Sequence, residues 1–431
     1  MKNLMRYIWS NKLLPKEKLK ATSGEDIEVI NTGYEEKEGC CIYCDARIKI
    51  GEREWSGNVV LHTKSSNWEK EIQKNGCSAY ENVILHITLN NDIDTLRKHG
   101  ESIHQLCMQL PQELADEFEY AATGKAMLDC ESAIASMGSI KMHCLMSRLL
   151  VERIEEKASR IRQLHKECDC NWEDTLFKLL ARNFGFGVQS GTFEAWAALL
   201  DMKALGKHRD NLLQVEAIFF GQAGLLCEER IPYYYRNEAL QSEYYNNLVR
   251  EYKFLKSKFG LKEIDGKMWG LGNATPHLRI ARLATLYSNG RATMSAIADC
   301  NTTAEVRNLL QSRLEGYWTN HLQFGSTDTK GNPPMRNRQL DLLIINTVAP
   351  MLYAYGKHRN NQSLCNNAED FLHNLDSEDN NIIRRWAAKG IEIGCAADSQ
   401  AVIQLQKAYC NRHRCTECHL AYTYIKEKIC L

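Results

Sequence analysis

Ala46-Arg-Ile-Lys-Ile-Gly-Glu-Arg-Glu-Trp-Ser-Gly-Asn-Val-Val-Leu-His-Thr-Lys-Ser-Ser-Asn-Trp68 is the stretch that decides the fold. Its pattern predicts two β-strands, joined by a short turn at Gly51-Glu-Arg-Glu54. The second strand, Val59 to Lys64, runs into a polar corner that ends at Trp68. The first strand of the pair is expected at 41–50, and further strands are expected at 29–30 and 83–88. The first 110 residues are therefore predicted to form a small mixed β-sheet domain with few helices.

The rest of the chain has the periodicity of helices. Apolar residues recur every three or four positions from Leu150 to Leu164, which predicts one stripe of a long amphipathic helix. The apolar segment from Leu340 to Tyr355 predicts a buried helix, kinked or broken at Pro350. The expected class is α+β: a sheet domain over 1–110, a helical domain over 111–325, and a helical C-terminal region over 326–431 that carries a cysteine cluster.

Composition limits the possible partners. The 431 residues include 54 basic and 54 acidic side chains, so the chain as a whole does not attract nucleic acid or anionic membranes. Any such binding must come from a local patch. No apolar run reaches the ~18 residues of a membrane helix, and the first residues lack the features of a signal peptide. We expect a cytoplasmic protein with no membrane partner. No nucleotide cofactor is expected, because 220–224 lacks the Lys and Ser/Thr of a phosphate loop.

Several motifs along the chain resemble one family. They are Ala46–Gly51, Trp55–Val59, His62, Ser65-Ser66, Trp68, Asn82–His86, His208–Ala217, Phe220–Gly224, Pro276–Ala284, Asp341–Pro350, and Tyr409-Cys410 with Cys415 and Cys418. In this order they resemble an uncharacterised bacterial family, domain of unknown function 2851. The resemblance covers nearly the whole chain.

The resemblance implies a nuclease-like core. Typical members carry Gly-Pro-Asp-Phe on one strand and Asn-Val-Glu-Ile-His on the next, which resembles the restriction-endonuclease-like PD-(D/E)xK fold. There, carboxylates on neighbouring strands hold Mg²⁺, which activates water. Aligned on the shared motifs, the family Asp falls on Ile42 and the family Glu falls on Val60. We therefore expect no hydrolysis at this position.

A rearranged site is the alternative. Strict alternation along the first strand places Ile42, Cys44, Ala46, Ile48 and Ile50 on one face, and Asp45 on the other. Asp45 therefore replaces the lost Asp only if a bulge intervenes. An active metal-dependent hydrolase would have to use Asp45, Glu52 or Glu54.

The polar residues that remain near the strand pair are candidates for binding. His62, Lys64 and Asp45 are the weak catalytic candidates. For nucleic acid, Lys64 would supply charge, Ser65 and Ser66 polar contacts, and Trp68 stacking. Arg279 is kept from a family motif that has otherwise eroded around 270–276. The competing interpretation is a solvated strand face whose corner is anchored by Trp68.

The densest group of potential metal ligands lies near the end of the chain. Cys410, Cys415 and Cys418 follow one another in a C-x₄-C-x₂-C pattern, and Cys430 lies twelve residues further on. Four thiolates could hold Zn²⁺ or an iron–sulfur cluster, with His413 or His419 as alternative zinc ligands. Reduced, packed cysteines and a redox pair remain alternatives.

Three functions follow from these patterns. The first is a catalytically inactive, nuclease-like protein that binds nucleic acid or a protein partner. The second is an active hydrolase with a rearranged site. The third is a structural or scaffold protein.

Overall fold

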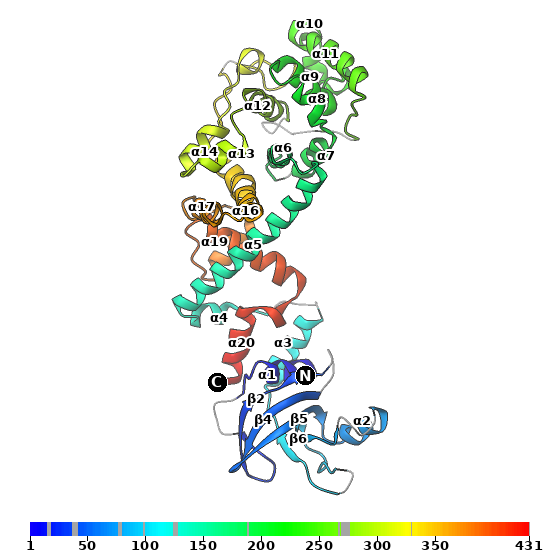
Figure 1. Cartoon of the computed structure of the whole chain (residues 1–431), viewed down its shortest axis with the longest axis vertical. Coiled ribbons are helices and arrows are strands. Elements are labelled where there is room, and N and C mark those ends of the chain that lie inside the picture. The colour runs from blue at the N-terminus through cyan, green and yellow to red at the C-terminus, as the bar shows by residue number, and fades with distance from the viewer. Residues whose placement is uncertain are drawn as a thin grey trace. The chain divides into compact units, whose positions relative to one another are not determined.

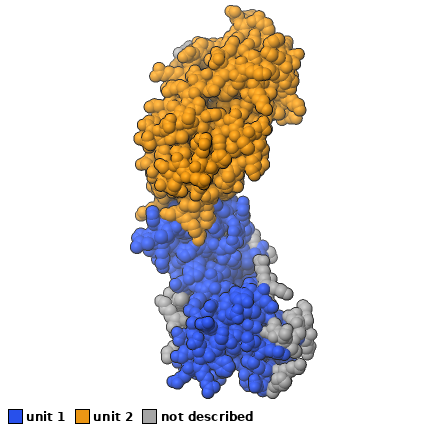
Figure 2. Space-filling model, in the orientation of Figure 1, with its two compact units in different colours: residues 1–146, 384–391, 402–431 blue, residues 147–383, 392–401 orange. Residues whose placement is uncertain are grey.

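The computed structural model describes residues 1–14, 19–36, 42–75, 80–97, 100–123, 128–187, 189–265, 268, 276–328 and 330–430, with the backbone alone for 73–75 and 430. The chain forms two compact units (Figure 2): unit 1 comprises residues 1–146, 384–391 and 402–431, and unit 2 comprises 147–383 and 392–401. The predicted mixed class is confirmed, since an N-terminal sheet precedes a largely helical region. The domain boundaries predicted from the sequence, at residues 110 and 325, stay a prediction. Over the described residues, no helix has the length and apolar character needed to cross a bilayer.

Unit 1 is built on one mixed sheet. Its strands are β1 (Leu19–Lys20), β2 (Asp26–Asn31), β3 (Tyr34–Glu35), β4 (Ile42–Ile50), β5 (Arg53–Lys64), β6 (Val83–Asn90) and β7 (His104–Cys107). Their order is β1-β2-β4-β5-β6-β7, and β3 pairs with the start of β4. β4 and β5 form the predicted antiparallel hairpin, whereas β6 runs parallel to β5 after the crossover helix α2 (Asn67–Asn75).

A bulge in β4 changes which residues share a face. Tyr43 pairs with Val59 and Ala46 pairs with Gly57, so two residues of β4 oppose one residue of β5. Asp45 has a left-handed φ of +56° there, which re-phases the strand. The sequence prediction that Ile42 shares a face with Ala46 and the residues after it is wrong, because strict alternation does not account for the extra residue.

Helices cover both faces of the sheet (Figure 1). α1 (Lys2–Ser10) packs on one face, where the Ser10 hydroxyl lies 2.9 Å from the Tyr43 hydroxyl. α2 packs on the other face against β5, and the fully buried Trp68 lies in its first turn. β5 is therefore buried from both sides, and its residues from Val59 to His62 are nearly inaccessible to solvent.

Chain segments far apart in the sequence complete unit 1. The first segment contributes α3 (Gln112–Ala122), α4 (Glu131–Ser136) and the start of α5 (Ser139–Glu167). The later segments contribute part of α18 (Asn381–Ala388), the end of α19 (Ala396–Gln404), the π-helical turn η6 (Leu405–Tyr409), the short 3₁₀ turns η7 (Cys410–Arg412) and η8 (Cys415–Glu417), and α20 (His419–Cys430). α20 packs against α4, and η8 packs against α3.

Unit 2 is helical over its described residues. After α5 it contains α6 (Trp172–Asn183), α7 (Ser190–Leu199), α8 (Met202–Gly206), α9 (Leu212–Gln222), η2 (Glu228–Arg230), α10 (Tyr233–Gln241), α11 (Glu243–Phe259), α12 (Pro276–Asn289), α13 (Met294–Asp299), α14 (Thr303–Leu310), η4 (Gly316–Thr319), α15 (Asn337–Leu343), η5 (Ile344–Val348), α16 (Ala349–His358) and α17 (Gln362–His373). The predicted stripe on α5 is confirmed, since Leu150, Ile154, Ala158 and Ile161 are buried.

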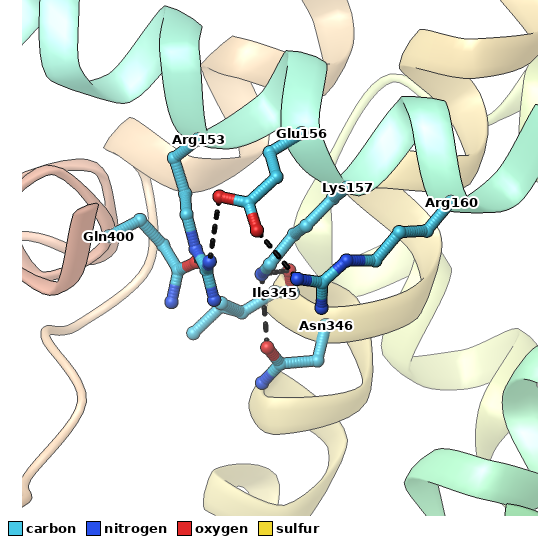
Figure 3. A network of polar contacts seen from close by, with 7 residues as sticks. All are labelled: Arg153, Glu156, Lys157, Arg160, Ile345, Asn346 and Gln400. Carbon is cyan, nitrogen blue, oxygen red and sulfur yellow. Dashed lines mark hydrogen bonds and ion pairs between the residues drawn. The ribbon is translucent and has the colours of Figure 1, made fainter. Parts of the chain in front are cut away.

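The predicted break near Pro350 is a π-helical turn, η5, between α15 and α16. Pro350 has no N–H, so it leaves main-chain carbonyls one turn earlier without their helical donor. The Lys157 ammonium donates to the Ile345 carbonyl at 3.2 Å and to Asn346 Oδ1 at 3.0 Å (Figure 3). The Asn183 amide donates to the Asn346 carbonyl at 2.9 Å. Side chains of α5 and α6 thus satisfy the carbonyls that the proline leaves unpaired.

Candidate functional site

Ile42 and Val60, the positions at which a metal-binding pair is expected, face each other directly across β4 and β5. They are 4% and 0% exposed and belong to one apolar cluster, whose other buried members are Trp68, Tyr80, Val83 and Ile103. Hydrocarbon side chains offer no oxygen to a hard cation such as Mg²⁺. The place that the family resemblance assigns to two carboxylates is therefore filled by close-packed apolar groups.

The acidic residues of the alternative site lie apart from this cluster. Asp45 is exposed at the bulge, beside the hydroxyl of Tyr34, whose pKa the carboxylate raises. Glu52 is exposed in the hairpin turn, and Glu54 is exposed on β5, where it pairs with Lys49. The bulge does move Asp45 out of strict alternation, but it directs this side chain to solvent. These three residues are not brought together into one site.

His62 enters a buried chain of polar groups. Its Nδ1 lies 2.9 Å from His86 Nε2, and His86 Nδ1 lies 2.8 Å from the Thr95 hydroxyl. Gln105 donates from its amide to the same hydroxyl. At the other end, His62 Nε2 lies 3.1 Å from a carboxylate oxygen of Glu71. The chain joins β5, β6 and β7 to helix α2.

The order of donors in this chain follows from Gln105. Since Thr95 accepts from Gln105, its own proton is available to His86 Nδ1. His86 Nε2–H then donates to His62 Nδ1, and His62 Nε2–H points to Glu71. Each ring is neutral in this arrangement. Burial lowers the pKa of His62 and lowers the pKa of His86 to about 3, which agrees with neutral rings at pH 7.

His86 is a partner that the sequence predictions missed. It stands inside the apolar run of β6, where a polar residue is a signal for a buried hydrogen bond. His62 and His86 lie near each other because β5 and β6 are parallel and paired. The candidate His62 is thus placed in a buried polar network between the sheet and α2, bonded to His86 through Nδ1 and facing Glu71 through Nε2.

The polar corner after β5 already binds a carboxylate of its own chain. The Ser65 and Ser66 hydroxyls each donate to Asp92 at 2.8 Å, and the Ser66 N–H donates at 2.9 Å. The Ser66 hydroxyl lowers the pKa of Asp92 most strongly, and the Ser66 N–H and the Ser65 hydroxyl add to this. Asp92 thereby places a negative charge beside the N-terminus of α2. Both serines are engaged where the sequence predicted contacts to nucleic acid.

Two further binding candidates have internal partners. Trp68 is 2% exposed, and its indole N–H donates to the Leu96 carbonyl at 3.2 Å. A buried ring cannot stack on a base, so this proposed contact is replaced by a structural one. Arg279 donates to the Gly185 carbonyl at 2.8 Å and to Gln189 Oε1 at 3.1 Å. Lys64, in contrast, is exposed at the end of β5.

The cysteine segment gains a partner from a distant part of the chain. Cys410, Cys415 and Cys418 line a cavity of about 260 Å³ in unit 1, and Cys130 lines it too. Burial raises the pKa of the Cys410 thiol to about 12 and also raises the pKa of Cys130. The side chain of the predicted ligand Cys430 lies outside the described residues. Sequence spacing could not indicate Cys130, because 280 residues separate it from Cys410.

Within the part of the chain that the structure describes, no group of three or more His, Cys, Asp or Glu side chains is arranged to hold a metal ion.

Comparison with known proteins identifies a family but no individual relative. No curated protein and no solved structure matches the chain. A family model described as "Protein of unknown function (DUF2851)" matches residues 2–381, which leaves 410–418 beyond the matched part. The chain therefore belongs to the DUF2851 family of proteins of unknown function.

Proposed function

We propose that this protein binds single-stranded nucleic acid without hydrolysing it. The observation that carries this proposal is the α11 basic surface, defined as Lys207, Lys253, Phe254, Lys258 and Phe259. Phe254 is 59% exposed, which is unusual for so large an apolar side chain, and lysines flank it on α11. The surface lies entirely within unit 2.

Charge and aromatic rings are interleaved on this surface. The Lys258 ammonium lies 5.7 Å from the ring centroid of Phe254 and 5.0 Å from that of Phe259. Lys207, just after α8, lies 5.6 Å from the same Phe259 ring. Residues 250–262 hold five basic side chains and one acidic side chain, a local net charge of +4. Glu263 then neutralises Lys256 through an ion pair of 2.5 Å, so Lys207, Lys253 and Lys258 carry the argument.

This combination matches what an unpaired strand offers. Lysines attract the phosphate backbone, and an exposed ring stacks on bases of any identity. The basic and aromatic groups that the sequence predictions sought at Lys64 and Trp68 thus occur together on α11. Because the whole chain is neutral, binding here would depend on this local patch alone.

The non-hydrolytic half of the proposal rests on Ile42 and Val60. Their apolar cluster excludes the carboxylate oxygens that a restriction-type nuclease needs at these positions. The nuclease-like ancestry of the sheet is part of the same proposal. It is supported by the direct pairing of these two positions on adjacent strands.

Fluorescence anisotropy with labelled single-stranded DNA and RNA, over a range of salt concentrations, tests the binding. Phe254→Ala should weaken binding about tenfold through lost stacking. Lys258→Glu should reduce the slope of log affinity against log salt by about 0.7 or more. Tyr233→Ala is the matched control, since Tyr233 is 87% exposed but residues 228–238 hold three acidic and two basic side chains, a local net charge of −1.

Three results would contradict the proposal. Equal effects of Phe254→Ala and Tyr233→Ala would mean that the α11 basic surface is not the binding site. A loss of affinity confined to Lys64→Glu would return the site to the strand end. Cleavage of the labelled strands with Mg²⁺ or Mn²⁺, abolished by Asp45→Asn, would instead support the rearranged hydrolase.

A further inference from the structure

Four cysteines from two distant segments of unit 1 line the same cavity of about 260 Å³. Cys130 immediately precedes α4. Cys410 and Cys415 begin the turns η7 and η8, and Cys418 immediately precedes α20. Short turns, rather than one continuous helix, therefore present the three later cysteines. Four thiols are the complete protein ligand set of a [4Fe–4S] or [2Fe–2S] cluster.

We propose that Cys130, Cys410, Cys415 and Cys418 hold an iron–sulfur cluster in this cavity. The proposal changes the ligand set predicted from sequence, because Cys130 takes the place of Cys430. It does not depend on nucleic-acid binding, which we assign to unit 2.

The cavity favours a cluster over a single zinc ion. Zinc draws four sulfurs to about 2.3 Å from one point, so the ligands close on the ion and leave no space between them. Among the described residues no group of three or more His, Cys, Asp or Glu side chains is arranged around one metal ion, and these four cysteines are no exception. They border an open volume instead, and the remaining lining is mostly apolar, as in Leu405 and Leu420. An iron–sulfur cluster, which contains several iron ions and bridging sulfides, can fill such a volume while the four thiolates remain part of the cavity lining.

The charged groups around the cavity suit an anionic cofactor. Arg385, Lys389 and Asp129 line it, so the charged lining carries one net positive charge. Lys389 is also paired with Asp129 at 2.8 Å. An iron–sulfur cluster with four thiolate ligands carries net negative charge, which nearby cations stabilise.

Helix geometry excludes Cys430 from this ligand set. α20 begins at His419, directly after Cys418, and extends to Cys430. A rise of 1.5 Å per residue places its two ends about 16 Å apart. A cysteine side chain is far too short to span that length, so Cys418 and Cys430 cannot bind the same group.

Analysis of the full chain, purified without oxygen, tests the assignment. We expect a brown protein with broad visible absorption, and iron and acid-labile sulfide in equal amounts. Cys130→Ser should remove most of this absorption and iron. Cys430→Ser should keep both, and so should Cys227→Ser, which changes a partly buried cysteine of unit 2.

Circular dichroism of each variant separates loss of the cofactor from loss of the fold. Should Cys130→Ser fail to fold, Cys415→Ser provides the same test from a partly exposed 3₁₀ turn. One zinc per chain without iron would overturn the cluster. Protein without metal after anaerobic purification and reconstitution with iron and sulfide would also overturn it. Loss of iron in Cys430→Ser but not in Cys130→Ser would restore the ligand set predicted from sequence.

Discussion

The chain buries a carboxyl group in unit 2 and has no carboxyl group in the apolar cluster around Ile42 and Val60 of unit 1. In unit 2, Glu216 of α9 is 4% exposed, and burial raises its pKa to about 7. The Tyr244 hydroxyl donates to Glu216 at 2.7 Å while it accepts from the Trp318 indole N–H at 2.7 Å. In unit 1, Ile42 and Val60 lie equally deep among apolar side chains.

The difference shows what a buried acid requires. Glu216 is tolerated because a fixed donor reaches it and because it can take up a proton. The two cluster members that carry donors, Trp68 and Tyr80, already donate to the Leu96 carbonyl and to Glu71. The neighbouring His62 and His86 are engaged with each other. Without a free donor, apolar packing is the arrangement of lowest free energy at this position.

Placing an acid in the apolar cluster around Val60 should have the largest effect on stability. Val60→Glu would bury an unpaired carboxyl at a position with no solvent access, and we expect a loss of about 4 kcal/mol in stability at pH 7. Hydrogen exchange of β4 and β5 amides in increasing urea measures the change within unit 1. Lys64→Glu, at an exposed position on the same strand, is the control. A loss below 1 kcal/mol would show that the cluster accommodates an acid.

Removing the buried acid from unit 2 should have a somewhat smaller effect, of opposite sign. The folded pKa of Glu216 lies above its ordinary value of 4.5. The protonated group thus favours folding below pH 4.5, and this contribution is lost as the pH rises through about 7. Glu216→Gln should therefore be more stable than the wild type by up to about 3 kcal/mol at pH 8. Urea unfolding of unit 2 across this pH range measures the difference, and parallel pH profiles would contradict it.

Acidification tests the histidine pair beside the apolar cluster. The pKa of His86 is lowered from 6.5 to about 3, so the unfolded chain takes up a proton below pH 6.5 and the folded chain does not. The wild type should lose about 2 kcal/mol between pH 6.5 and pH 5 through this group. His86→Gln should show a flatter profile, whereas His143→Gln, at an exposed site on α5, should not. An unchanged slope in His86→Gln would mean that His86 is protonated in the folded state.

The polar corner after β5 should give the smallest effect. Asp92→Ala removes the acceptor for Ser65 and Ser66 at the start of α2. Amide exchange in the first turn of α2 should become faster, with little change in β4. Asp94→Ala changes a nearby exposed carboxylate and is the control. Equal exchange in the two variants would mean that the corner is held by other contacts.

Local patterns in the sequence predicted much of the fold, but not the contacts that define the site. Alternation predicted β4 and β5, and their pairing places Ile42 opposite Val60. The bulge at Asp45 escaped prediction because a left-handed conformation of a non-glycine residue depends on its surroundings. Trp68 and Arg279 were expected at a binding surface, but their burial depends on tertiary packing. Cys130 lines the same cavity as Cys410, Cys415 and Cys418 only because the chain folds back over a long sequence distance. The spacing of cysteines within a short motif does not reveal such a contact.

The division of unit 1 among three chain segments has a consequence for its biosynthesis. Residues 402–431 cover α4 and complete the cavity, yet they leave the ribosome long after the sheet. Until then the apolar side of α4, with the buried residues Ala133 and Ile134, lacks the packing of α20. A chain that stops before residue 402 would therefore expose apolar surface, which favours aggregation. Unit 1 can close only after residues 402–431 have been synthesised, although its sheet is made much earlier.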